Sequence, residues 1–148
     1  MKKTLVLAMF LFILASGLAA PVQAAPSLEI YQEVINSVPS LGSSVRSLPK
    51  YLTPQEIGGD YIIAFDGTYG ELEIHGNVEP ESGIVTFLVI KPVAGDVDTT
   101  SMASSVADCL GRKYGRASTV VPGEAYLWSK GRFQLQYVIT SGIITGNY

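Results

Sequence analysis

The chain contains few of the residues on which enzyme chemistry usually depends. Its 148 residues include one histidine and one cysteine, and no glycine-rich phosphate loop, dinucleotide fingerprint, CxxC pair or G-x-S-x-G sequence occurs. The lone Cys109 excludes an intramolecular disulfide. Its place on the apolar side of a predicted helix favours a buried thiol over a nucleophile or an intermolecular disulfide. We therefore predict that the protein is not an enzyme and uses neither a metal ion nor a cofactor.

The first 24 residues have the pattern of a cleaved signal peptide. Lys2 and Lys3 precede an uncharged, apolar stretch that runs from Thr4 to Leu18, and Val22-Gln23-Ala24 follows as a cleavage motif. The apolar stretch of about 15 residues is shorter than the roughly 20 that a bilayer-spanning helix needs. We expect residues 1–24 to be removed, no stable membrane insertion afterwards, and a single domain of residues 25–148 in the periplasm or outside the cell.

Acidic residues outnumber basic ones in the predicted mature part. Two of the ten basic residues lie in the signal, which leaves eight against thirteen acidic residues and a net charge of −5. This balance argues against nucleic acid or an anionic membrane surface as the partner. Three basic residues, Arg112, Lys113 and Arg116, lie near the end of a predicted helix, where we expect them to complement the helix dipole.

Hydrophobic spacing predicts helices in two parts of the chain. Residues 27–38 and 102–114 place apolar side chains three or four positions apart, and Gly115 stands where a C-cap glycine belongs. A weaker helix is predicted over 41–48. Thr53-Pro54-Gln55-Glu56 has the spacing of a capping box and predicts one short helical turn.

Period-two patterns predict six strands, in two groups of three. The first group is 61–65, 71–78 and 84–90, with turns at Asp66-Gly67 and Pro80–Gly83, and the second group is 125–129, 132–140 and 143–148. The fold class is therefore α+β, with helices packed on one face of an antiparallel sheet in the order helical segment-βββ-α-βββ. The shared order of the two halves suggests a pseudo-repeat. In this layout the chain resembles secreted β-lactamase-inhibitor proteins, which set tandem helix-plus-meander units on one sheet.

One acidic strand offers the best local candidate for chemistry. Glu71, Glu73 and His75 alternate along the predicted strand 71–78, so they share a face and lie about 6.5–7 Å apart in succession. This spacing is too wide for all three to bind one ion without long side-chain reach. An ordinary solvent-facing strand is the favoured interpretation, and a small hydrolase or metal site at this acidic hairpin is the alternative.

Aromatic residues suggest a recognition surface. Tyr126 and Trp128 alternate on one predicted strand, and Tyr137 lies on the next. Tyrosine and tryptophan concentrate at binding hot spots because they offer large, rigid contact areas with a polar tip. The same regular pattern also fits a core beneath the second helix, and both interpretations stay open.

The function predicted from the sequence is an exported, non-catalytic domain that binds another macromolecule, in the first place a protein. An inhibitor, an immunity protein or an envelope accessory factor would satisfy it, and the candidate binding residues are Tyr126, Trp128, Tyr137, Glu71, Glu73 and His75. The alternative is a carrier of a small apolar ligand in a pocket between helix and sheet. Homo-oligomerisation stays open.

Overall fold

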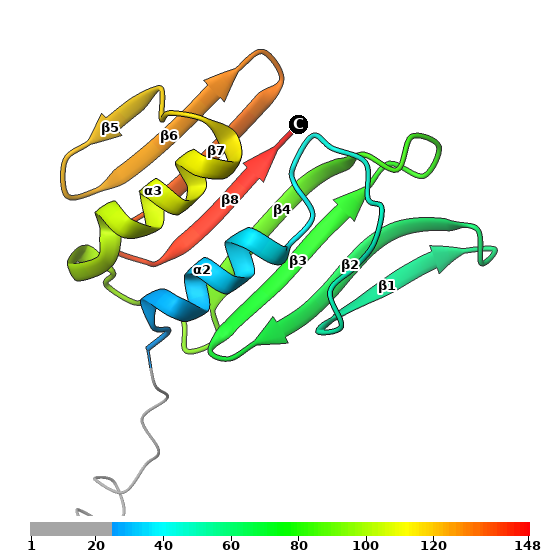
Figure 1. Cartoon of the computed structure of the whole chain (residues 1–148), viewed down its shortest axis with the longest axis horizontal. Helices are drawn as coiled ribbons and strands as arrows, with labels where there is room; N and C mark the ends of the chain where they lie inside the picture. The colour runs from blue at the N-terminus through cyan, green and yellow to red at the C-terminus, as the bar shows by residue number, and fades with distance from the viewer. Residues whose placement is uncertain (1–24) are drawn as a thin grey trace, which may run out of the picture.

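The fold is an eight-stranded antiparallel sheet with two helices on one face, as Figure 1 shows. The computed structural model describes residues 25–148, so the predicted signal peptide lies outside the described residues. The elements follow in this order: α2 (Leu28–Ser37), β1 (Leu52–Ile57), β2 (Tyr61–Tyr69), β3 (Leu72–Val78), β4 (Val85–Pro92), η1 (Thr100–Met102), α3 (Ala103–Tyr114), β5 (Thr119–Val121), β6 (Ala125–Lys130), β7 (Phe133–Val138) and β8 (Ile143–Asn147). None of the helices in this part of the chain is long and apolar enough to cross a membrane.

The two halves of the chain have the same order of elements, a helix followed by four strands. The strand order is β1-β2-β3-β4-β8-β7-β6-β5, so each half contributes four neighbouring strands and the halves join where β4 pairs with β8. Helix α2 lies over the first half and α3 over the second (Figure 1). The predicted arrangement of helices on one face of an antiparallel sheet is confirmed, in a chain that is mostly sheet.

Each half has one strand more than the three predicted. Residues 53–56 belong to β1, where a helical turn was expected, and Pro54 is accommodated because β1 is an edge strand. Strand β5 has only three residues, too few for a periodic pattern. The helix predicted over 41–48 is absent. Instead, this segment runs back along the sheet, and Ser44 forms a β-bridge with Ile84.

The turn predicted at Asp66-Gly67 is also wrong. Both residues lie inside β2, and the hairpin to β3 turns at Gly70, whose φ of 55° favours glycine. Gly67 has a different reason to be glycine, because a Cβ there would lie 2.9 Å from the carbonyl carbon of Tyr51 and closer still to its oxygen. The glycine permits close approach of two chain segments, which a sequence pattern does not distinguish from a turn.

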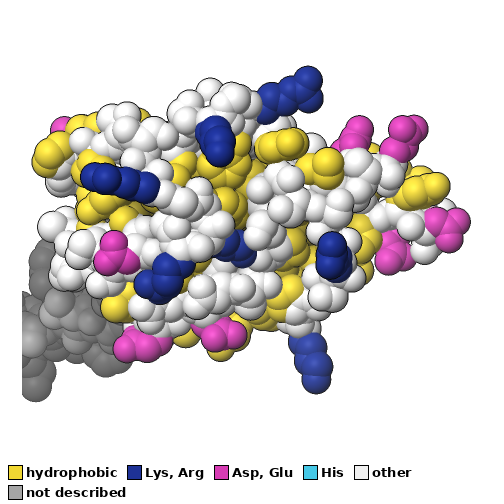
Figure 2. Space-filling model, turned by 45° about the horizontal axis from the view of Figure 1, so that its top comes forward, with side chains coloured by type: hydrophobic (Ala, Val, Ile, Leu, Met, Phe, Trp, Pro, Cys, Tyr) yellow, Lys and Arg dark blue, Asp and Glu magenta, His cyan; other side chains and the backbone are white. Residues whose placement is uncertain are grey.

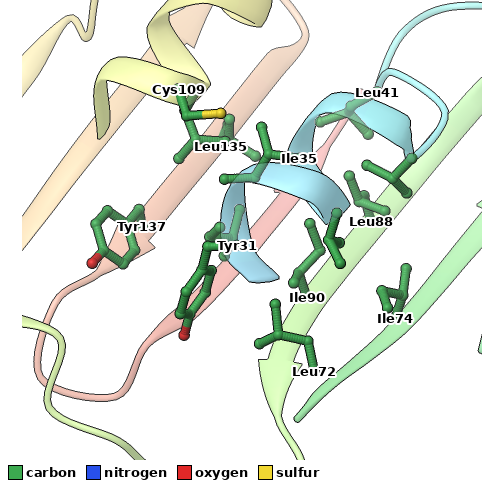
Figure 3. Close-up of a cluster of buried hydrophobic side chains, with 14 of the residues drawn as sticks. Tyr31, Ile35, Leu41, Leu72, Ile74, Leu88, Ile90, Cys109, Leu135 and Tyr137 are labelled. Atoms are coloured by element: carbon green, nitrogen blue, oxygen red, sulfur yellow. The ribbon is translucent and has the colours of Figure 1, made fainter. Parts of the chain in front are cut away.

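The core lies between the helices and the inner face of the sheet. Tyr31 and Ile35 of α2 and Cys109 of α3 meet side chains from the central strands, such as Leu88 and Leu135 (Figure 3). Cys109 is buried, as predicted. Where Ile35 of α2 and Leu110 of α3 face the central strands, the remaining space has a volume of about 0 Å³ and has no room for a water molecule. Side chains therefore fill this central part of the contact between helices and sheet.

Polar contacts tie α2 to the sheet and α3 to α2. The Tyr31 hydroxyl donates to the carbonyl oxygen of Gly142 over 2.7 Å, which ties α2 to the β7–β8 turn. The Lys113 ammonium of α3 donates to the carbonyl oxygens of Ile35 (2.7 Å) and Val38. These carbonyls belong to the C-terminal end of α2, where a cation is favourable. Lys113 thus complements a helix dipole, but that of the neighbouring helix.

Candidate binding surface

The outer face of the sheet carries no helix within residues 25–148, and we call it the open face. Side chains alternate along every strand, so each strand that buries one set of residues under the helices presents the other set here. The pairing registers place across the open face Thr53, Gln55, Asp66, Thr68, Glu73, His75, Asn77, Phe87, Val89, Lys91, Thr145, Asn147, Gln134, Gln136, Leu127 and Ser129. It is a mixed polar and apolar surface.

A hydrogen-bonded group of side chains crosses three strands of the open face. Asp66 of β2 faces His75 of β3, and its carboxylate accepts from His75 Nδ1 through one oxygen and from Gln55 Nε2 through the other, over 2.6 Å. His75 Nε2 lies 3.0 Å from the side-chain oxygen of Asn77. The Phe87 ring flanks the imidazole, with centroids 6.2 Å apart. The carboxylate therefore orients the imidazole, as in a catalytic dyad, but the second nitrogen faces an amide and no nucleophile.

The acidic strand does not gather into a metal site. Glu73 shares the open face with His75, yet its carboxylate lies 3.6 Å from the ammonium of Lys91 on β4. Glu71 lies in the β2–β3 hairpin, where its carbonyl oxygen accepts from Val93 N. Among residues 25–148, no group of three or more histidine, cysteine or acidic residues is placed to hold an ion. The three predicted residues thus have three different partners and do not act together.

The other half of the open face is hollowed. A depression of about 330 Å³ lies over β6, β7 and β8. It is lined by the side chains of Leu127, Gln134, Gln136, Thr145 and Asn147 and by Gly146. The hollow therefore offers amide and hydroxyl groups beside an aliphatic side chain, a combination suited to a polar partner surface.

The predicted aromatic residues lie on the opposite, helix-covered face. Tyr137 is fully buried and Trp128 is 3% exposed, whereas Tyr126 is half-buried. The Tyr126 and Tyr137 rings stack, with centroids 6.1 Å apart, and Trp128 Nε1 donates to the carbonyl oxygen of Gly115 over 2.8 Å. Of the two interpretations kept open above, Tyr137 and Trp128 occupy the positions of core residues beneath α3.

Four residues of the open face are not among the binding residues predicted from the sequence: Asp66, Asn77, Phe87 and Gln136. The sequence predicts Asp66 in a turn and Gln136 only as part of the strand 132–140. Which residues become neighbours depends on strand pairing, and the register that brings Asp66 to His75 follows from the true turn at Gly70.

Basic and acidic residues are concentrated in different parts of the chain, beyond the cluster predicted near the end of the second helix. Residues 25–102 contain three basic and eleven acidic residues, whereas residues 103–148, which form α3 and β5–β8, contain five basic and two acidic ones. A sum of charge by halves of the chain would have shown this. Figure 2 shows lysine and arginine side chains around α3, and acidic ones at the end that carries the β1–β2 and β3–β4 hairpins.

No protein-family model matches the chain, and no curated protein or solved structure matches it. The resemblance to β-lactamase-inhibitor proteins is thus one of layout and assigns no residue a role.

Proposed function

We propose that the protein is an exported, non-catalytic domain that binds another protein through the open face of its sheet. The observation that carries this proposal is that a whole sheet face, without a covering element in residues 25–148, presents preformed polar contacts beside half-buried apolar side chains. Scattered apolar residues are normal on a protein surface, but a continuous sheet face of mixed character suits recognition.

The size of the open face agrees with a protein partner. Eight strands about 4.8 Å apart give a width of about 34 Å, and strands of about six residues give a length of about 20 Å. The resulting area of about 700 Å² is close to the roughly 800 Å² that each partner contributes to a standard interface. A small ligand would need a deeper site.

The chemistry of the open face favours a transient complex. Interfaces of non-obligate complexes are about as polar as the rest of a protein surface. Here the Asp66–His75–Asn77 group and the Glu73–Lys91 pair are already formed, so their side chains lose less conformational freedom on binding. Phe87 and Val89 lie on β4, near the middle of the sheet, where they would form the apolar centre of the interface.

Site-specific photocrosslinking tests this proposal. A photoreactive amino acid is placed at Val89 or Gln136 on the open face, and at the exposed helix positions Glu33 or Ser104 as matched controls. The expected result is one crosslinked protein, recovered from the exported fraction, at the two open-face positions only. Val89→Arg should abolish the crosslink formed from Gln136, and Glu33→Arg should leave it unchanged.

Two results would overturn the proposal. The first is equal crosslinking from the sheet and helix positions, which would indicate unspecific contact. The second is a crosslink to a second copy of the chain, which would make the open face a self-association surface.

A further inference from the structure

A groove lies between α3 and the β5–β6 hairpin, on the helix side of the sheet and away from the open face. It has a volume of about 590 Å³. Tyr126 and Trp128 of β6 lie along it, with ring centroids 6.4 Å apart, and Val120 of the edge strand β5 is 50% exposed beside them. The accessible apolar lining is supplied by Val120 and the half-buried Tyr126, whereas Trp128 is only 3% exposed.

Small residues on α3 leave this groove open. Ala107 and Gly111 are one helical turn apart and line it on the helix side. A Cβ added at Gly111 would meet no atom within 4 Å, so the space beside this residue is empty. Glycine is a poorer helix former than alanine, so its presence here is unfavourable for α3 itself.

The charge at the groove is mainly positive. Arg112 and Arg116 line it together with Asp108, and neither arginine forms an ion pair with any residue of the described part. Arg116 and Trp128 also line an adjoining depression of about 380 Å³ that includes Lys113 and Lys130. The groove thus lies within the basic half of an otherwise acidic protein.

We propose that this groove binds an acidic protein segment that inserts an apolar side chain between α3 and β5. The uncovered lining accounts for the apolar side chain, and the free arginines account for the acidic neighbours. A membrane surface is too flat to fill a groove. A long polyanion such as nucleic acid would extend over the acidic half of the molecule, which carries eleven acidic and three basic residues. A short acidic segment contacts the basic half alone.

Fluorescence anisotropy with a defined probe tests this inference. The probe is a labelled ten-residue peptide of alternating glutamate and leucine, and the control peptides alternate lysine and leucine or glutamate and serine. The protein is expressed as the full chain. We expect binding of the glutamate–leucine peptide only, weakened by added salt because the arginine contacts are exposed.

Matched variants locate the site of binding. The double variant Arg112→Glu with Arg116→Glu should weaken binding at least tenfold, whereas Arg46→Glu with Lys50→Glu makes the same charge change in the acidic half and should change binding less than twofold. Gly111→Phe fills the empty space and should abolish binding with all charges kept, and Gly111→Ala should retain it. Circular dichroism checks that every variant is folded.

The inference is overturned if the glutamate–leucine peptide binds Gly111→Phe as well as the unchanged protein, or if the lysine–leucine peptide binds equally. It is also overturned if light scattering shows a dimer that Arg112→Glu with Arg116→Glu converts to a monomer, because the occupant is then the acidic end of a second copy. These outcomes do not depend on the open face, so they are distinct from failure of the proposed function.

Discussion

The substitution Gly76→Ala should destabilise the protein strongly, although it adds a single methyl group. Gly76 of β3 pairs with Phe65 of β2, and the fully buried Phe65 ring lies directly over it. A Cβ at Gly76 would lie 2.6 Å from Cε1 and from Cε2 of this ring, and closer still to Cζ. Ordinary carbon–carbon contacts need 3.4 Å or more, so the ring has to move away from the strand.

The cost of this movement can be bounded from both sides. Overpacking a core costs about 1–3 kcal/mol where neighbours can adjust, and loss of a whole buried phenylalanine costs about 3–5 kcal/mol. Phe65 is fully enclosed and has little room to adjust, so we expect Gly76→Ala to lower the free energy of unfolding by about 2–4 kcal/mol. The neighbouring pair is Asp66 and His75, so the same change should disturb the open face.

Urea unfolding followed by tryptophan fluorescence measures the effect, because the single tryptophan, Trp128, is buried. Gly111→Ala is the control and should be neutral or stabilising by up to about 1 kcal/mol. In the double variant Phe65→Ala with Gly76→Ala, the new methyl group occupies vacated space, so the two effects should not add. A loss below about 0.5 kcal/mol for Gly76→Ala, or additivity in the double variant, would refute the reasoning.

Three further predictions concern pH and processing. Burial lowers the pKa of Lys113 to about 8, against its usual value of 10.5. Between these two values the unfolded chain binds more protons than the folded one, so the free energy of unfolding should rise with pH. A flat profile in the unchanged protein, or the same rise in Lys113→Met, would contradict this. Burial raises the pKa of Tyr31 and raises that of Tyr114 to about 12. The free energy of unfolding should therefore fall as the pH rises above about 10, where the tyrosines of the unfolded chain ionise. In the variant Tyr31→Phe, thermal unfolding should show a less steep fall. The mass of the exported protein should correspond to residues 25–148, and a mass that includes residues 1–24 would show that the signal is retained.

The parts of the fold that were predictable from sequence are those with a local signal. The amphipathic pattern located α2, and in the structure its first turn is capped by the Ser27 side chain, which accepts from Ile30 N. Helix α3 ends at Gly115, which has a φ of 86° and was expected there. The missed elements have no local signal: β1 contains a proline, and β5 is three residues long. Both are edge strands that pair with one neighbour only.

The candidate sites were harder to predict because they depend on the two faces of the sheet. Alternation showed that Glu73 and His75 share a face, and that Tyr126 and Trp128 share one, but not which face the helices would cover. The helices cover the face of the aromatic pair, since Trp128 is buried. Because the helices cover that face, His75 lies on the open face. A sequence pattern gives relative orientation along a strand, and the packing of distant helices decides which set is exposed.

This alternation also allows the two proposed surfaces to be separated on one strand. In β6, Leu127 faces the open side and lines its hollow, whereas the adjacent Trp128 faces α3 and lines the groove. A charge at Leu127 should therefore impair recognition by the open face and leave peptide binding in the groove unchanged, and Gly111→Phe should do the reverse. If Leu127→Glu abolished both in a folded protein, the two surfaces would have to bind as one, and neither proposal would stand as written. Because adjacent residues of one strand report on opposite faces, a general loss of stability cannot imitate a selective result.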